Sequence, residues 1–195
     1  MEYDLLKYFH VLGPVLIGGG FIGVWMADLR SRQLSELKTF SEAVRNIAVF
    51  YDGLVVPGAL LLLTSGAWMI AKFYGGWDFL HIPWLAGMVL LFAFEFIEGN
   101  TITRLYFMRL RRLTRLALAA GHVTPDLQRA RGELTPTFTH FLDLPMLFLI
   151  IALGVMRPVT WTLFFAGSAA AITLATLLTL VIPRLYPWSP EVQQA

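Results

Sequence analysis

Five long apolar stretches limit what this chain can fold into more than any other feature. Each has about 20 residues, the length at which an α-helix rising about 1.5 Å per residue crosses about 30 Å of hydrocarbon. The stretches lie at about residues 5–27, 48–72, 79–103, 138–156 and 160–182. The sequence therefore predicts an all-α fold: a polytopic transmembrane helical bundle of four core helices plus a fifth C-terminal helix. We expect residues 1–195 to form a single membrane domain.

The composition agrees with a chain that alternates between lipid and water. Hydrophobic residues make up 57% of the sequence and charged residues only 14%, against about 45–50% and about 25% in soluble domains. The Lys and Arg residues flank the apolar stretches, so membrane topology explains the net charge of +2 and no nucleic-acid partner is expected. Because the chain has no cysteine, disulfides and thiolate metal sites are excluded.

Two basic segments predict the orientation. Residues 28–46 carry four Lys or Arg residues and residues 104–135 carry seven, and such segments face the cytoplasm in bacterial inner-membrane proteins. We therefore expect a multi-pass inner-membrane protein with its N-terminus outside and its C-terminus in the cytoplasm. Membrane lipids are the expected partners, together with a homo-oligomer or a larger membrane complex. Gly167, Ser168 and Ala171 suit the fifth span either to bundle packing or to a dimer contact.

Local signals predict further structure between the spans. Apolar residues from Leu34 to Ile47 recur at helical spacing, which predicts an amphipathic helix that lies against the inner leaflet or extends the second span. Thr124, Pro125 and Asp126 mark a helix start. Arg157 and Pro158 predict a tight break between the last two spans.

Ionisable side chains inside spans are the first candidates for a functional site, because burying each one in lipid costs at least about 2.5–3.5 kcal/mol. Five fall at similar depth in the predicted topology: Asp52, Glu95, Glu98, His140 and Asp143. The pairs 95/98 and 140/143 are each three residues apart and so share a helix face. This acidic layer is interpreted as a metal site, as a proton or ion path, or as a structural layer of hydrogen bonds and ion pairs with neighbouring Arg residues.

A second candidate site lies toward the opposite face. His10 lies in the outer part of the first span and His81 at the outer start of the third. A neutral imidazole at that depth suits haem iron, so His10 and His81 are candidate ligands of a haem b cofactor. A five-coordinate haem on His10 alone and a buried hydrogen-bonding role for His10 are the alternatives. Gly18, Gly19 and Gly20 let another helix or a flat ring approach the first span.

Short motifs resemble those of a group of small bacterial membrane proteins. The group includes the HemJ-type protoporphyrinogen oxidases, the CopD-like copper-resistance proteins and the uncharacterised integral membrane family 2269. The resemblance covers Leu5 to Pro158 and is carried by Leu6-Lys7-Tyr8-Phe9-His10, Val56-Pro57 to Gly66, Trp84, and Phe141-Leu142-Asp143-Leu144-Pro145 to Arg157-Pro158.

The resemblance implies that His10 binds haem b, as the matching histidine is thought to do in the HemJ-type oxidases. No other ligand carries over. The third span has Gly87, Met88, Glu95 and Glu98 where that family has a lysine and a histidine, and Arg157 replaces a lysine before proline.

Two functions follow as hypotheses, and the sequence leaves open whether the protein is an enzyme. The first is an inner-membrane haem b protein on His10 that works in electron transfer or porphyrin oxidation. The second is a non-redox metal-handling protein, or a proton or ion carrier, that uses the acidic layer.

Overall fold

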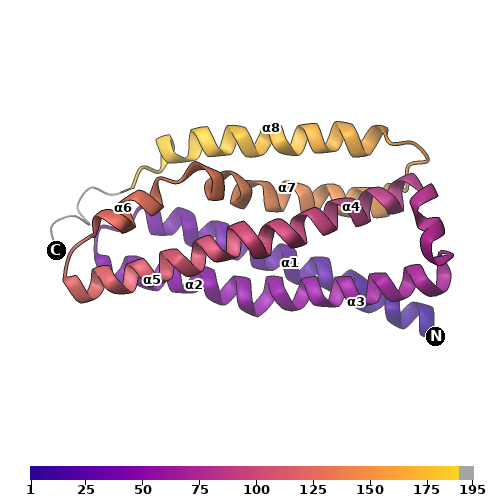
Figure 1. The fold of residues 1–195 in the computed structure, drawn as a ribbon, viewed down its shortest axis with the longest axis horizontal. Helices are drawn as coiled ribbons and strands as arrows, with labels where there is room; N and C mark the ends of the chain where they lie inside the picture. Colours follow the sequence, from indigo (N-terminus) through magenta and orange to yellow (C-terminus); the bar gives the residue numbers. More distant parts are fainter. Residues whose placement is uncertain (189–195) are drawn as a thin grey trace.

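The computed structural model describes residues 1–188, and every regular element among them is a helix. Long helices lie side by side along one axis, and α8 (Thr162–Leu185) lies at one edge against α7 (Leu134–Met156) (Figure 1). Five continuous helical stretches are long and apolar enough to cross a membrane. The predicted all-α membrane bundle is therefore confirmed.

Two of the five stretches are composite. α2 (Leu37–Phe50), the π-helical turn η1 (Tyr51–Val55) and α3 (Val56–Phe73) form one rod without a break. α4 (Pro83–Glu98), the π-helical turn η3 (Gly99–Thr103) and α5 (Arg104–Ala120) form a second. The amphipathic segment from Leu37 therefore extends the second span, which decides between the two alternatives that the sequence left open.

The composite rods are longer than a membrane is thick. The stretch from Leu37 to Phe73 has 37 residues, or about 55 Å at 1.5 Å per residue, against about 30 Å of hydrocarbon. The excess lies at the end of the bundle where α1 (Glu2–Arg32) finishes and where α5 joins α6 (Pro125–Arg131) (Figure 1). Both α5 and α6 carry arginines. We call this the basic end, and the opposite end, with Glu2, Lys72 and the 3-10 turn η2 (Gly76–His81), the N-terminal end.

The structure contains the predicted helix start at Thr124 and the predicted break at Arg157. Thr124 caps α6 and accepts a hydrogen bond from the Leu127 amide at 3.3 Å. Arg157 ends α7 in the left-handed conformation, with φ 48°, so the chain turns sharply before α8 begins.

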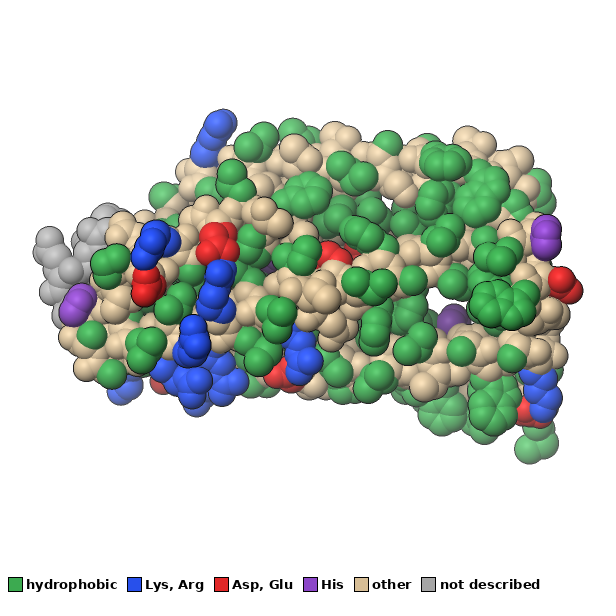
Figure 2. Space-filling model, in the orientation of Figure 1, with side chains coloured by type: hydrophobic (Ala, Val, Ile, Leu, Met, Phe, Trp, Pro, Cys, Tyr) green, Lys and Arg blue, Asp and Glu red, His purple; other side chains and the backbone are tan. Residues whose placement is uncertain are grey.

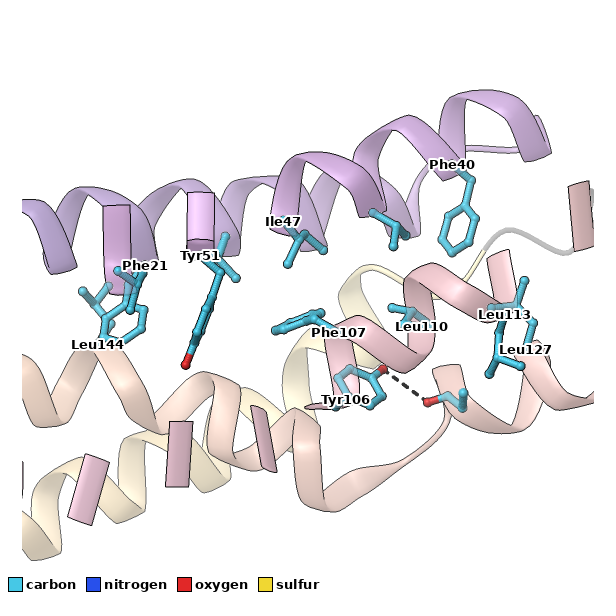
Figure 3. Close-up of a cluster of buried hydrophobic side chains, with 14 of the residues drawn as sticks. Phe21, Phe40, Ile47, Tyr51, Tyr106, Phe107, Leu110, Leu113, Leu127 and Leu144 are labelled. Atoms are coloured by element: carbon cyan, nitrogen blue, oxygen red, sulfur yellow. Dashed lines mark hydrogen bonds between the residues drawn. The ribbon is translucent and has the colours of Figure 1, made fainter. Parts of the chain in front are cut away.

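A dense core holds the basic end together. Phe40 and Ile47 of α2 point toward Phe107 and Leu110 of α5 (Figure 3). The Tyr106 hydroxyl donates to the Ala130 carbonyl oxygen at 3.2 Å and so ties α5 to α6. This contact is the dashed line in Figure 3.

Small residues let the helices approach closely. A Cβ at Gly13 of α1 would lie 2.9 Å from the Leu62 Cβ, and one at Gly20 would lie 2.5 Å from the Val55 Cγ2. A Cβ at Gly167 of α8 would lie 2.3 Å from the Leu149 Cδ1 of α7. Gly167 therefore faces α7 of the same chain, and the fifth span packs within the bundle.

Candidate functional site

A cavity of about 970 Å³ separates the helices at the N-terminal end. Its walls come from α1, α3, α4 and α7, and they are mostly apolar. The titratable residues that line it are His10, Lys7, Arg157, Tyr3 and Tyr74. Figure 2 shows this end of the molecule hollowed, with a histidine side chain inside the hollow. The volume lies at the upper end of the range of small-molecule and cofactor sites, about 300–1,000 Å³.

The hydrogen bonds around His10 fix its tautomer. The Ser65 hydroxyl donates its single proton to the Leu61 carbonyl oxygen at 2.6 Å. Its oxygen can then only accept from the His10 ring, whose Nδ1 lies 3.2 Å away. In this arrangement Nδ1 carries a proton, and the neutral form of the ring keeps a lone pair on Nε2. Nε2 has no hydrogen-bond partner among residues 1–188.

Glycines flatten the cavity walls near this ring. Gly66 of α3 lies against it, since a Cβ there would approach the His10 Cε1 to 3.1 Å. Gly18 and Gly19 of α1 line the same cavity, and a Cβ at Gly19 would meet no atom within 4 Å. Gly154 of α7 faces the thioether of Met88, with its ideal Cβ 3.1 Å from the sulfur.

Two cations lie on the wall of the cavity. Lys7 is one turn before His10 on α1, and Arg157 ends α7 with its guanidinium 5.2 Å from the centre of the Trp84 ring. Both side chains are exposed. They supply positive charge at the wall of an otherwise mostly apolar cavity.

The second predicted histidine lies elsewhere. His81 is exposed at the end of η2 and does not line the cavity. The structure therefore brings His10, and not His81, to the candidate ligand site.

The acidic layer divides into three groups. Asp52 forms an exposed ion pair with Arg104 at 3.1 Å. The His140 Nε2 lies 4.0 Å from Asp28, which is itself bonded to Arg32 at 3.0 Å in a buried pair. Glu95 and Glu98 lie on α4, which packs against α7, the helix of Asp143. The Thr103 hydroxyl, which donates to Glu98, lies 2.9 Å from the Thr139 hydroxyl of α7. The five predicted side chains thus do not form one site, and among residues 1–188 no group of three or more His, Asp or Glu side chains is arranged to hold a metal ion.

The side chains of Glu95, Glu98 and Asp143, which we call the carboxyl triad, form no ion pair among residues 1–188; Glu98 and Asp143 are buried and Glu95 is half-buried. Glu98 and Asp143 expose 6% and 2% of their surface. The Thr103 hydroxyl donates to the Glu98 Oε1 at 2.7 Å. The Glu95 Oε1, Glu98 Oε2 and Asp143 Oδ2 atoms are buried and have no hydrogen-bond partner in the described chain. No Lys or Arg among residues 1–188 forms an ion pair with the triad.

A smaller cavity of about 120 Å³ adjoins the triad. Glu95, Tyr51 and Asn100 supply its polar wall, and Phe92, Leu147 and Ile150 line both this cavity and the larger one. Tyr51 donates from its hydroxyl to the Gly99 carbonyl oxygen at 2.9 Å, which joins η1 to η3.

Several residues of these sites were not predicted. Ser65, Lys7 and Arg157 belong to the large cavity, and Asp28 and Arg32 form the buried pair beside His140. A serine next to a glycine within the apolar second span was the available signal for Ser65. Asp28 and Arg32 lie four residues apart, the spacing of a helical ion pair, but their burial depends on α6 and α7, which lie far away in the sequence.

Comparison with known proteins identifies the family. Residues 4–158 match the family model described as predicted integral membrane protein, DUF2269. The match covers α1 to α7, most of the chain, so the protein belongs to this family; α8 lies beyond the matched segment. No curated protein and no solved structure matches the chain.

Proposed function

We propose that this member of the DUF2269 family of predicted integral membrane proteins binds haem b in the large cavity, with His10 as the axial ligand, and acts in electron transfer or porphyrin oxidation. One observation carries the proposal. His10, whose Nδ1 lies 3.2 Å from the Ser65 hydroxyl, lines a cavity of about 970 Å³ and has its Nε2 free of hydrogen bonds to residues 1–188. Metal-binding histidines are oriented in this way, by a hydrogen bond from the other ring nitrogen.

The remaining residues of the cavity suit a flat, mostly apolar ring with acidic substituents. Gly18, Gly19 and Gly66 provide walls without side chains beside His10. Lys7 and Arg157 supply positive charge for carboxylates. Haem iron, when bound, exchanges one electron at a time. The resemblance of the His10 segment to HemJ-type oxidases favours a porphyrin over other flat ligands.

A haem titration of the detergent-purified protein tests this proposal. We expect a Soret band and saturable binding for the wild type, loss of binding for His10→Ala, and wild-type binding for His81→Ala, which removes an exposed histidine outside the cavity. If the wild type shows no Soret band after haem supplementation, or if His10→Ala binds haem as the wild type does, the proposal is wrong.

A second function is favoured by the carboxyl triad. Three carboxyl groups without a cation suit the binding and release of protons better than metal handling, which would need a cluster that the described residues do not provide. We propose as the alternative a non-redox proton carrier. In vesicles with an internal pH dye, Glu95→Gln is expected to abolish proton flux under this alternative; equal flux in Glu95→Gln, His140→Ala and the wild type would contradict it.

A further inference from the structure

Full ionisation of the carboxyl triad would place three negative charges in a site that contains no paired cation among residues 1–188. An ionised carboxylate in a low-dielectric interior is costly unless a cation or several hydrogen bonds compensate it. Here a single hydroxyl, that of Thr103, donates to one of the three groups. Three adjacent ionised groups would also repel one another. Uptake of protons by the triad therefore reduces the negative charge that its buried surroundings have to accommodate.

Other titratable or charged groups near the triad do not neutralise it. The Tyr51 hydroxyl from η1 is bonded to the Gly99 carbonyl oxygen. Arg104, the cation on the same side, is already paired with Asp52. On α7, His140 lies one turn before Asp143 and faces Asp28 of α1. The unpartnered oxygens of Glu98 and Asp143 thus remain available for protons.

The triad is positioned next to the large cavity. Glu95 lines the smaller cavity, and Phe92, one turn earlier on α4, separates that cavity from the larger one. A space of about 120 Å³ with Glu95, Asn100 and Tyr51 on its wall has the size and the polar partners that ordered water needs. It shares Phe92, Leu147 and Ile150 as wall residues with the large cavity.

Both π-helical turns lie at the level of the triad. η1 carries Tyr51, and η3 carries Asn100 and Thr103. Such turns are rare and occur frequently at functional sites. In this protein the Thr103 hydroxyl donates to the Glu98 carboxylate, whereas the Tyr51 hydroxyl and the Asn100 amide donate to the carbonyl oxygens of Gly99 and Phe96.

We propose that Glu95, Glu98 and Asp143 form a proton-exchange site coupled to electron transfer in the large cavity. For each electron that a one-electron donor delivers to the cavity, one proton moves from water to a carboxylate of the triad, which becomes a carboxylic acid; on oxidation both leave. The net charge of the bundle then stays constant through the cycle. This inference rests on the proposed haem function.

A redox titration of the haem-loaded protein at several pH values tests the coupling. In the wild type, the equilibrium constant for reduction is expected to fall as the pH rises. The limit for one proton per electron is about tenfold per pH unit. Glu95→Gln and Asp143→Asn are expected to weaken this dependence. Asp52→Asn is the matched control, because Asp52 lies at the same level but is exposed and paired with Arg104.

The outcomes separate the two proposals. If haem binds normally and Glu95→Gln and Asp143→Asn both keep the wild-type pH dependence, the proton-exchange site is wrong while the haem proposal stands. If the wild type binds no haem, both fail. If one variant does not fold, the other gives the result, because each removes one carboxyl group of the same triad.

Infrared spectroscopy provides a second test that does not need haem. The wild type at neutral pH is expected to show the carbonyl band of a protonated carboxylic acid, shifted in heavy water and reduced in Glu95→Gln. Absence of this band would show that the triad holds no exchangeable proton and would overturn the inference.

Discussion

The two ends of this bundle use the same long helices in opposite ways. At the N-terminal end, α1, α3, α4 and α7 stand apart around a cavity of about 970 Å³, and the polar groups on its wall, such as His10, keep unpartnered atoms. At the basic end, Phe40, Ile47 and Leu110 fill the space between the helices completely. The buried charged residues there, Asp28, Arg32 and Arg131, are paired or stacked on an aromatic ring.

The buried charges show the same contrast. At the basic end, Asp28 is paired with Arg32, whose guanidinium stacks 4.5 Å from the centre of the Trp188 ring. The Arg131 guanidinium also stacks on Trp188, 4.2 Å from the centre of the ring. Burial lowers the pKa of this guanidinium to about 10. The carboxyl triad, midway along the bundle, has no such compensation. The comparison indicates that the basic end holds the helices together, whereas in the other half they surround a cavity.

Removal of a large side chain should give the largest difference in stability between the basic end and the cavity half. Phe40 is fully buried, whereas Phe148 lines the cavity and is 58% exposed. Phe40→Ala is expected to lower the free energy of unfolding by about 3–5 kcal/mol, and Phe148→Ala by less than about 1 kcal/mol. Unfolding by dodecyl sulfate in mixed micelles, followed by circular dichroism, measures both. Equal losses would contradict a division into a packed half and an open half.

Addition of a methyl group at neighbouring glycines of α1 gives the next largest effect. Gly20→Ala would force the new Cβ against Val55, so it is expected to destabilise the protein by about 1–3 kcal/mol. Gly19→Ala points into open space, so its stability should stay unchanged or rise by up to about 1 kcal/mol. Thermal unfolding of the two variants in the same detergent distinguishes them, and a loss at Gly19 as large as at Gly20 would show that this wall of the cavity is packed.

The smallest effect is expected at the rim of the N-terminal end. Lys72 and Glu2 form an exposed ion pair at 2.5 Å that joins α3 to α1. Glu2→Gln is expected to cost no more than about 1 kcal/mol, and the difference should shrink in high salt. A loss of several kcal/mol, measured by the same unfolding assay, would mean that the rim contributes to closing the open half.

Much of the fold could be predicted because each helix that crosses the hydrocarbon layer needs about 20 mostly apolar residues. The spans, the start of α6 at Thr124 and the break at Arg157 all follow from local patterns. The orientation of the bundle in the membrane stays a prediction from the basic segments. The depth of His10 could also be predicted, since it depends only on its place along α1.

The grouping of the polar residues could not be predicted in the same way. Asp52 and Glu95 lie at similar depth, but rotation of their helices turns Asp52 outward to Arg104 and Glu95 inward to the triad. His140 faces Asp28 because α1 and α7 are neighbours. The depth of a residue in the membrane follows from its place along the span. The direction of its side chain depends on the rotation of the helix and on which helices pack together.

Chemical rescue of His10 tests the central claim most directly. In His10→Gly the imidazole is removed while Ser65 and the glycine walls remain, so free imidazole can enter the space beside Gly66. The measurement is the Soret band of the haem-supplemented variant with and without imidazole. We predict that the variant alone shows no haem binding and that imidazole restores it. Binding by His10→Gly equal to that of the wild type in the absence of imidazole would contradict the account.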